Sequence, residues 1–201
     1  MVVVSAYKQC IVCVHYICRS VKTLYKKGDP AFCDHYRPIC LRSIGHQLFA
    51  SMLRQRLSDA GIEECLWPPQ FGFRAARSTE DAIFIARRRI ELARAQRNGK
   101  VSLLAFDWKK DFDSININSL MDALRRAGLP ESMLQVIQAV LRNRVFSVSD
   151  FGCASELREQ LSGIPQGCTL SPLLFVIAMS VLLDDAVKQL SPAAYAQFVI
   201  E

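Results

Sequence analysis

The sequence lacks the features that mark membrane-spanning, secreted and repetitive proteins. It contains no uninterrupted run of about 18 apolar residues, so no transmembrane helix and no membrane partner are expected. Lys8, His15 and Arg19 interrupt the apolar opening MVVVSAYKQCIVCVHYICRSV, which also lacks the basic start and small-residue cleavage site of a signal peptide. Internal repeats and low-complexity linkers are absent as well.

The cysteines do not form a recognisable disulfide framework. Eight are present, and most are scattered through ordinary globular sequence. Without a secretory signal, reduced thiols in an intracellular protein, nuclear or cytoplasmic, are expected. Cys10, Cys13, His15 and Cys18 have metal-ligand chemistry, but their spacing is tighter than usual for zinc and no second half of a site follows. We therefore expect no zinc there.

Composition favours a globular chain of one domain or one and a half. The chain has 201 residues, and 51% of them are hydrophobic, which is enough for a core. Lysine and arginine number 25 against 19 aspartate and glutamate, a net charge of +6. This balance suits a polyanionic partner, although many basic proteins bind none.

Apolar periodicity predicts a series of helices. Leu48, Phe49, Met52, Leu53 and Leu57 recur at helical spacing before a stop at Gly61. Later helices are predicted over 117–127, closed by a glycine, over 131–141, and from a cap at Ser171 to about residue 190.

A further helix is predicted after Ser78 or Thr79, either of which can cap it. Its inward face would carry four apolar residues, namely Ile83, Ile85, Ala86 and Ile90. The arginines Arg87, Arg88, Arg89, Arg94 and Arg97 would lie largely outside. The arginine run is therefore interpreted mainly as an exposed helix face.

Strands are predicted at three places. Residues 101–106 form a short apolar run typical of a strand buried on both faces. Residues 144–150 alternate in polarity, and a returning strand is expected within 155–162. Residues 25–43 read as loop with short extended pieces. The fold class is therefore α+β, with helices packed on a small, mainly antiparallel sheet.

Acidic residues gather where the 101–106 strand should end. Asp107, Asp111 and Asp113 follow the apolar run within seven residues. A strand entering a solvated turn is one explanation. A divalent cation is the other, because Mg²⁺ prefers a few carboxylates together with substrate phosphate oxygens. Such a site needs a triphosphate and one more acid from elsewhere in the chain.

Four motifs in order resemble those of reverse transcriptases, above all those of non-LTR (LINE-like) retrotransposons. FDWKKDFDS and GIPQGCTLSPLLF resemble the first and second catalytic motifs. LYKKGDPAFCDHYRPICLRSIGHQLFASMLRQRL and QFGFRAARSTEDAI resemble the two finger motifs. The resemblance covers residues 24–190. It implies a right-hand polymerase with fingers-like residues 24–100, a partial palm at 101–201 and an unmatched segment at 1–23.

The resemblance implies roles for the first motif. Asp107 matches the catalytic, metal-binding aspartate, which would hold Mg²⁺ of a two-metal site against the nucleotide phosphates. Phe112 matches the ring that excludes a 2′-hydroxyl from the nucleotide pocket, with a plain core role as the alternative. Asp113 matches a residue that is usually structural. Asp111 departs from the family, which commonly has a small residue there.

Further binding residues follow from the other motifs. Gly163, Pro165 and Gly167 match the loop beneath the templating base pair, where Gln166 can brace template and nucleotide. From the finger motifs, phosphate or template contacts are implied for these basic residues: Lys26 or Lys27, Arg37, Arg74 and Arg77. The implied partners are an RNA template, a DNA primer and a deoxynucleoside triphosphate.

The second acidic motif of the family, YADD, has no clear counterpart. Asp184 and Asp185 are expected on a hydrated helix face, and Gln197 and Phe198 follow Tyr195-Ala196 where acids are required. A truncated or degenerate, inactive copy that stops before the hairpin is therefore expected. The alternatives are a non-catalytic nucleic-acid-binding remnant, a group II intron maturase-type polymerase fragment, and a fragment that does not fold.

Overall fold

The computed structural model describes residues 18–103, 105–150 and 152–191. Its strands are β1 (Cys18–Tyr25), β2 (Tyr36–Leu41), β3 (Arg144–Asp150), β4 (Cys153–Ala154) and β5 (Arg158–Gln160). Its α-helices are α2 (Ile44–Asp59), α3 (Thr79–Ala95), α4 (Asp111–Ser114), α5 (Ile117–Arg126), α6 (Glu131–Leu141) and α7 (Ser171–Lys188). The short 3₁₀ helices are η1 (Cys33–His35) and η2 (Ile62–Cys65).

The strands form one small, mainly antiparallel sheet, as predicted. β1 pairs antiparallel with β2 and parallel with β3, and β3 pairs antiparallel with β4 and β5. Val21 lies opposite Cys40 on β2 and Val148 on β3, which fixes the register. β2 is an edge strand, and its Pro38 suits that position because proline has no N–H to donate to a further strand.

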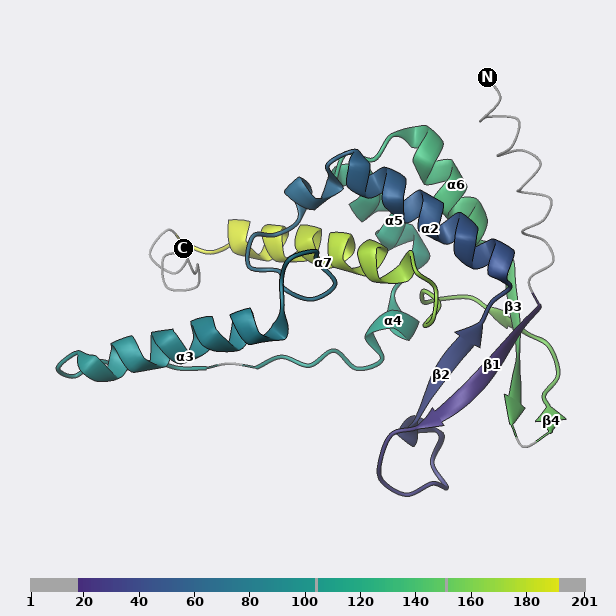
Figure 1. The fold of residues 1–201 in the computed structure, drawn as a ribbon, viewed down its shortest axis with the longest axis horizontal. Coiled ribbons are helices and arrows are strands. Elements are labelled where there is room, and N and C mark those ends of the chain that lie inside the picture. Colours follow the sequence, from purple (N-terminus) through teal and green to yellow (C-terminus); the bar gives the residue numbers. More distant parts are fainter. Residues whose placement is uncertain (1–17, 104, 151, 192–201) are drawn as a thin grey trace.

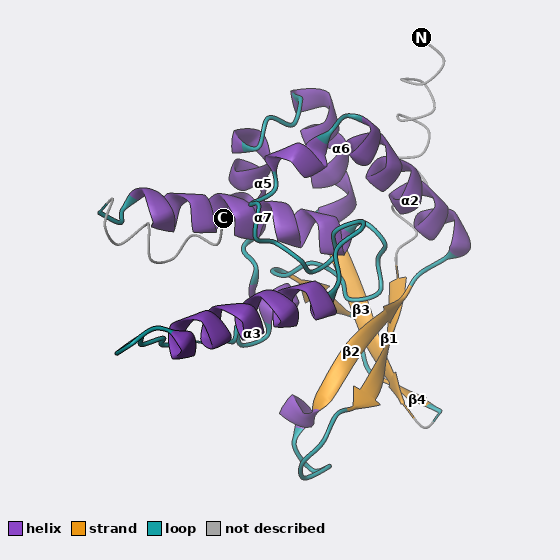
Figure 2. Cartoon of the chain, turned by 60° about the vertical axis from the view of Figure 1, so that its left-hand side comes forward, coloured by secondary structure: helices purple, strands orange, loops and turns teal. Residues whose placement is uncertain are grey.

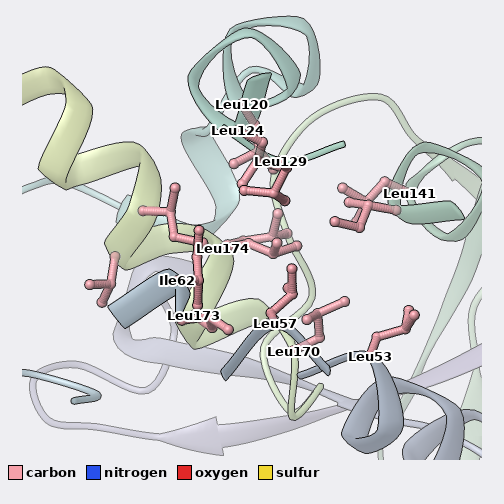
Figure 3. Close-up of a cluster of buried hydrophobic side chains, with 14 of the residues drawn as sticks. Leu53, Leu57, Ile62, Leu120, Leu124, Leu129, Leu141, Leu170, Leu173 and Leu174 are labelled. Carbon is pink, nitrogen blue, oxygen red and sulfur yellow. The ribbon is translucent and has the colours of Figure 1, made fainter. Parts of the chain in front are cut away.

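The main hydrophobic core lies among the helices at one end of the sheet (Figures 1 and 2). Figure 3 shows leucines from α2, α5, α6 and α7 meeting there. Leu124 and Ile137 are fully buried in it, and no strand residue belongs to this cluster. The helices therefore pack mainly on one another, which differs from the predicted packing of helices over the sheet.

Local sequence signals account for the predicted helices that are confirmed. Ser43 accepts a hydrogen bond from the amide of His46 at the start of α2. Ser78 and Asp81 form a reciprocal capping box at the start of α3. α6 and β3 have the predicted bounds. The predicted cap of α7 is wrong by one residue, because Leu170 occupies the N-cap and Ser171 is the first helical residue.

The predicted inward face of α3 is confirmed only in part. Ile85, Ala86 and Ile90 are half-buried and Arg87, Arg88 and Arg89 are exposed, as predicted, but Ile83 is 62% exposed and no residue of the helix is fully buried. The helix projects from the helical body (Figure 1). In α2, Leu48 and Met52 are likewise exposed, because its buried stripe runs through Leu53 and Leu57 instead.

The strand predicted at residues 101–106 is not formed in the described part of that segment. Leu103 and Phe106 are about 80% exposed, at 78% and 80%, and none of the pairings described above involves them. An apolar strand is stable only when neighbours accept its backbone hydrogen bonds and cover its faces. Because no described strand does so, Asp107 lies in an irregular segment rather than at a strand end.

Several sequence expectations concern residues outside the described part. Cys10, Cys13 and His15 lie there, as do the candidate acidic-motif positions 195–198. Within the described ranges, no helix combines the length and apolarity needed to cross a membrane. Cys33, Cys65, Cys153 and Cys168 are free thiols there, as expected.

Truncating a core leucine of α7 tests the helical core. Leu174 is 1% exposed, whereas Leu182 on the same helix is 46% exposed. We expect Leu174→Ala to lower the free energy of unfolding by about 2–5 kcal/mol and Leu182→Ala by clearly less. Urea unfolding followed by circular dichroism measures both. Equal losses, or a wild-type chain without a cooperative transition, would contradict this core.

Candidate active site

Two segments about fifty residues apart in the sequence are hydrogen-bonded to each other. We define them as the 110–115 turn, which includes α4, and the 162–168 loop, which precedes α7. The amide of Gly163 donates to the carbonyl of Ile115 at 2.8 Å, and the amide of Ile164 donates to that of Phe112 at 2.7 Å. The Gln166 side chain donates from Nε2 to Asp113 Oδ2 at 3.1 Å. The structure thus joins the segment FDWKKDFDS to the segment GIPQGCTLSPLLF.

Gly163 makes this approach possible. Its φ is +78°, a conformation that favours glycine, and a Cβ built on it would lie 2.7 Å from the backbone oxygen of Asp113. Gly167 is similarly constrained on the opposite side, with φ +105° and a built Cβ 2.8 Å from the carbonyl oxygen of Cys40. Both glycines therefore permit close backbone contact within the fold.

Groups from the sheet and α2 hold the other side of the 162–168 loop. The amide of Cys40 on β2 donates to the carbonyl of Gln166 at 2.8 Å, which also satisfies part of the free edge of β2. Gln47 Nε2 donates to the carbonyl of Gly167 at 2.6 Å. Arg144 Nη2 donates to the carbonyl of Gly163 at 2.7 Å. The loop is therefore fixed from both sides.

A cavity of about 400 Å³ lies between this loop and one face of the sheet. Asp113, Pro165 and Gln166 line one side of it. The sheet side is contributed by alternate strand residues, which include Val21, Pro38, Cys40 and Phe146. The cavity therefore combines an apolar wall with two carboxylates, Asp113 and Glu159, and two side-chain amides, Gln160 and Gln166.

Partial burial raises the pKa of the Asp113 carboxyl above its ordinary value of 3.8. The negative charge of Asp111 raises this pKa further, whereas the hydrogen bond from Gln166 lowers it. Lys110 and Lys26 also lower it through their positive charges. Burial is the largest of these effects, so the environment disfavours the charged form.

Phe112 packs between two other aromatic rings. Its ring stacks on Phe175 of α7 with centroids 4.9 Å apart and planes 14° apart, and it meets Phe73 edge to face at 6.2 Å. It is half-buried against the helical core. The ring is thus held in place by packing at the start of the 110–115 turn.

Asp107 is exposed and lines neither this cavity nor a second one of about 430 Å³ beside α5 and α7, which Asp111 lines. The segment that carries Asp107 is anchored three residues later, at Lys110. There Lys110 Nζ forms an ion pair with Asp34 Oδ1 at 2.7 Å, which links the turn to the loop between β1 and β2. On α7, the exposed Asp184 is ion-paired with Lys188, and the half-buried Asp185 is ion-paired with Arg126.

The basic residues of the finger motifs fall into two groups. Lys27 and Arg37 are exposed around the β1–β2 loop, and strand alternation puts Arg37 on the opposite face of β2 from the cavity-lining Pro38. Arg74 and Arg77 instead brace their own loop, because both donate to the carbonyl of Pro68, at 3.4 and 3.0 Å. Their contact with a template stays a prediction.

Sequence reasoning missed several residues that hold the 162–168 loop and the 110–115 turn in place. Gln47 is one polar residue among many in a helix, and Arg144 opens a strand whose alternation predicts no buried charge. Ser162, whose Oγ donates to the carbonyl of Asp113 at 3.2 Å, also carries no recognisable signal. These contacts depend on three-dimensional neighbours, so no local pattern could have indicated them.

Comparison with known proteins identifies the family to which these two motifs belong. The family described as "Reverse transcriptase (RNA-dependent DNA polymerase)" matches residues 24–198. The retrovirus-related Pol polyprotein from type-1 retrotransposable element R2 of Nasonia vitripennis is 32% identical over 155 residues, which is 77% of this chain. The RNA-directed DNA polymerase from mobile element jockey of Drosophila melanogaster is 28% identical over 80% of the chain.

A further relative is the probable RNA-directed DNA polymerase from transposon BS of Drosophila melanogaster, 28% identical over 79% of the chain. The relatives are much longer proteins. The chain spans 14% of the R2 polyprotein, 17% of the BS protein and 18% of the jockey protein.

Adding one methyl group at Gly163 tests the contact between loop and turn. Gly128 has a similar φ of +88° but open space around its Cβ position, so it is the matched control. We expect Gly128→Ala to cost about 1–2 kcal/mol of stability from backbone strain alone. Gly163→Ala should cost clearly more, because it adds a collision with the Asp113 backbone. Equal losses in urea unfolding would show that the loop and turn do not touch.

Replacing Asp113 with asparagine tests its electrostatic environment. Because its pKa is raised on folding, native protein binds this proton more tightly than unfolded chain does. The stabilising contribution of protonated Asp113 is present below pH 3.8 and is lost as pH rises through the raised native pKa. The free energy of unfolding of wild type relative to Asp113→Asn should therefore fall as pH increases across that window.

Urea unfolding of both proteins between pH 3 and 8 measures this difference. The exposed Asp59→Asn variant controls for the loss of one carboxylate elsewhere. A difference between wild type and Asp113→Asn that rises with pH would show that the carboxylate is stabilised, rather than penalised, in the native state.

Proposed function

This chain belongs to the reverse transcriptase family and is a domain of the non-LTR (LINE-like) type, and we propose that it binds an RNA template, a DNA primer and a deoxynucleoside triphosphate for RNA-templated DNA synthesis. Residues 24–100 would act as fingers and residues 101–201 as part of the palm. The sheet itself begins earlier, since β1 starts at Cys18.

The contact between the 110–115 turn and the 162–168 loop carries this proposal. A nucleotide-transferring site needs the group beside the incoming nucleotide and the group beside the template to be held at a fixed separation. Here Gln166 donates to Asp113, and two backbone hydrogen bonds reinforce that link. The cavity next to them is bounded by a sheet whose β1–β2 loop carries Lys27.

The loop is suited to a position beneath the template. Gly167 is exposed, so a nucleic-acid backbone can approach it, while its missing side chain makes room for the Cys40 carbonyl on the protein side. Pro165 and Gln166 are held rigidly beside it, and the half-buried Gln166 has a second amide proton available for a template group. Lys27 and Arg37, both exposed, would contact phosphates of the nucleotide or the template. Arg74 and Arg77 would add to the template path.

Phe112 would form the wall below the sugar of the incoming nucleotide. A ring discriminates against a 2′-hydroxyl only if it does not move aside, and stacking on Phe175 together with the Phe73 contact restrains this one. This proposal is compatible with a core role for Phe112. The packing that buries one side of its ring also fixes the side that would face the nucleotide.

Asp107 would supply a carboxylate to Mg²⁺, the ion that this family generally uses. Its exposed carboxylate fits the ion, which usually takes one or two carboxylates and completes its shell with water and phosphate oxygens. Within residues 18–103, 105–150 and 152–191, no three His, Cys, Asp or Glu side chains are grouped to hold a metal. The bound ion would neutralise charge on the transferred phosphoryl group.

Binding measurements test the proposed function. Poly(rA)/oligo(dT) should bind with an affinity that falls steeply with salt, because lysine and arginine displace counterions from phosphate. dTTP should then bind more tightly with Mg²⁺ than without it. Asp107→Asn should remove that Mg²⁺-dependent gain, roughly 10-fold or more, by deleting a metal ligand. The exposed Asp59→Asn is the matched control and should retain the gain.

Two results would contradict the proposal. Salt-sensitive binding of primer–template without any Mg²⁺-dependent affinity for dTTP would indicate a nucleic-acid-binding protein without a nucleotide site. An equal loss in Asp107→Asn and Asp59→Asn would show that the effect is general electrostatics and that Asp107 does not contact the ion.

A further inference from the structure

Arg144 is a buried cation at the start of β3. It is 1% exposed and stands first among the fully buried side chains by volume. Arg142, two residues earlier, is exposed. Burying a guanidinium is costly unless polar groups replace its water, so the partners of Arg144 determine what it does.

The partners of Arg144 are backbone carbonyls of the 162–168 loop. Nη2 lies 2.7 Å from the oxygen of Gly163 and 3.4 Å from that of Ser162. In the part of the chain that the structure describes, Nε and Nη1 have no hydrogen-bond partner, and no carboxylate forms an ion pair with this residue. Burial, and secondarily the charge of Arg42, lowers the pKa of Arg144 to about 10.

This arrangement couples the position of the loop to the energy of a buried charge. If the loop moved away, Arg144 would lose the carbonyls that partly replace its water, and its positive charge would be left buried without a partner. A neutral side chain imposes no such penalty. The loop is therefore held in one position more strongly than hydrogen bonds to neutral donors would hold it.

The same residue of the loop is held from both sides. Gly163 donates its amide to Ile115 in the 110–115 turn and accepts from Arg144 with its carbonyl. The peptide units that carry these two groups are consecutive, so a shift on one side moves the other. Gln166, three residues on, keeps its hydrogen bond to Asp113 only while this part of the loop stays in place.

We propose that Arg144 is a positioning residue, which fixes the 162–168 loop so that Gln166 stays on Asp113 beside the nucleotide and template. The role in binding rests on the proposed function. The structural part, that Arg144 fixes the loop, does not.

Three variants test the proposal. Arg144→Met keeps much of the side-chain volume and removes the charge and donors. Arg144→Lys keeps a charged donor that can reach one carbonyl. Arg142→Met removes an exposed arginine from the same segment and is the matched control.

Amide hydrogen exchange followed by NMR provides the first measurement, and it does not depend on activity. In Arg144→Met, the Gly163 and Ile164 amides should exchange about 10- to 100-fold faster than in wild type, the range expected for hydrogen bonds to a charged group. Amides in the middle of α6 and α7 should keep their protection. Arg144→Lys should restore part of the protection, and Arg142→Met should match wild type.

The second measurement is Mg²⁺-dependent dTTP affinity on poly(rA)/oligo(dT). It should fall in Arg144→Met and recover partly in Arg144→Lys, in parallel with exchange. Unchanged exchange at Gly163 and Ile164 would overturn the proposal, as would an equal loss of protection throughout the helices. Faster loop exchange with unchanged dTTP affinity would overturn the role in binding. A wild type that binds no primer–template would instead overturn the proposed function, and exchange would still decide whether Arg144 fixes the loop.

Discussion

The amide hydrogen bonds from Gly163 and Ile164 to the carbonyls of the 110–115 turn are the interaction on which the site depends. They exist because position 163 has no side chain and adopts a positive φ, so two backbones can meet where a Cβ would collide. Once they form, Gln166 lies within hydrogen-bonding distance of Asp113. The contact thereby brings the two motifs shared with reverse transcriptases together in space.

The 162–168 loop also separates the helical core from the cavity beside the sheet. Ile164 is fully buried in the core cluster, whereas Pro165 and Gln166 line the cavity. Apolar packing holds the loop toward the helices, and polar groups from β2, α2 and β3 hold its carbonyls. Under the proposed function, a loop restrained in both ways would cost little additional entropy on binding a nucleic acid.

Features that depend on local sequence were predictable, and features that depend on distant neighbours were not. The capping serine of α3 and the alternation of β3 predicted those elements correctly. The strand at 101–106 was wrong, because strand formation needs a pairing partner that apolar composition cannot supply. The site glycines were found by family resemblance. Arg142 and Arg144 look equivalent in sequence, yet only Arg144 is buried, with its side chain against the carbonyls of the 162–168 loop.

A double-mutant cycle between Asp113 and Gln166 tests the central claim most directly. The free energies of unfolding of wild type, Asp113→Ala, Gln166→Ala and the double variant give the interaction energy between the two side chains. A direct contact predicts a coupling of about 0.5 kcal/mol or more, within the range measured for contacting pairs. A coupling indistinguishable from zero would show that the two motifs do not meet through these residues and would contradict the site described here.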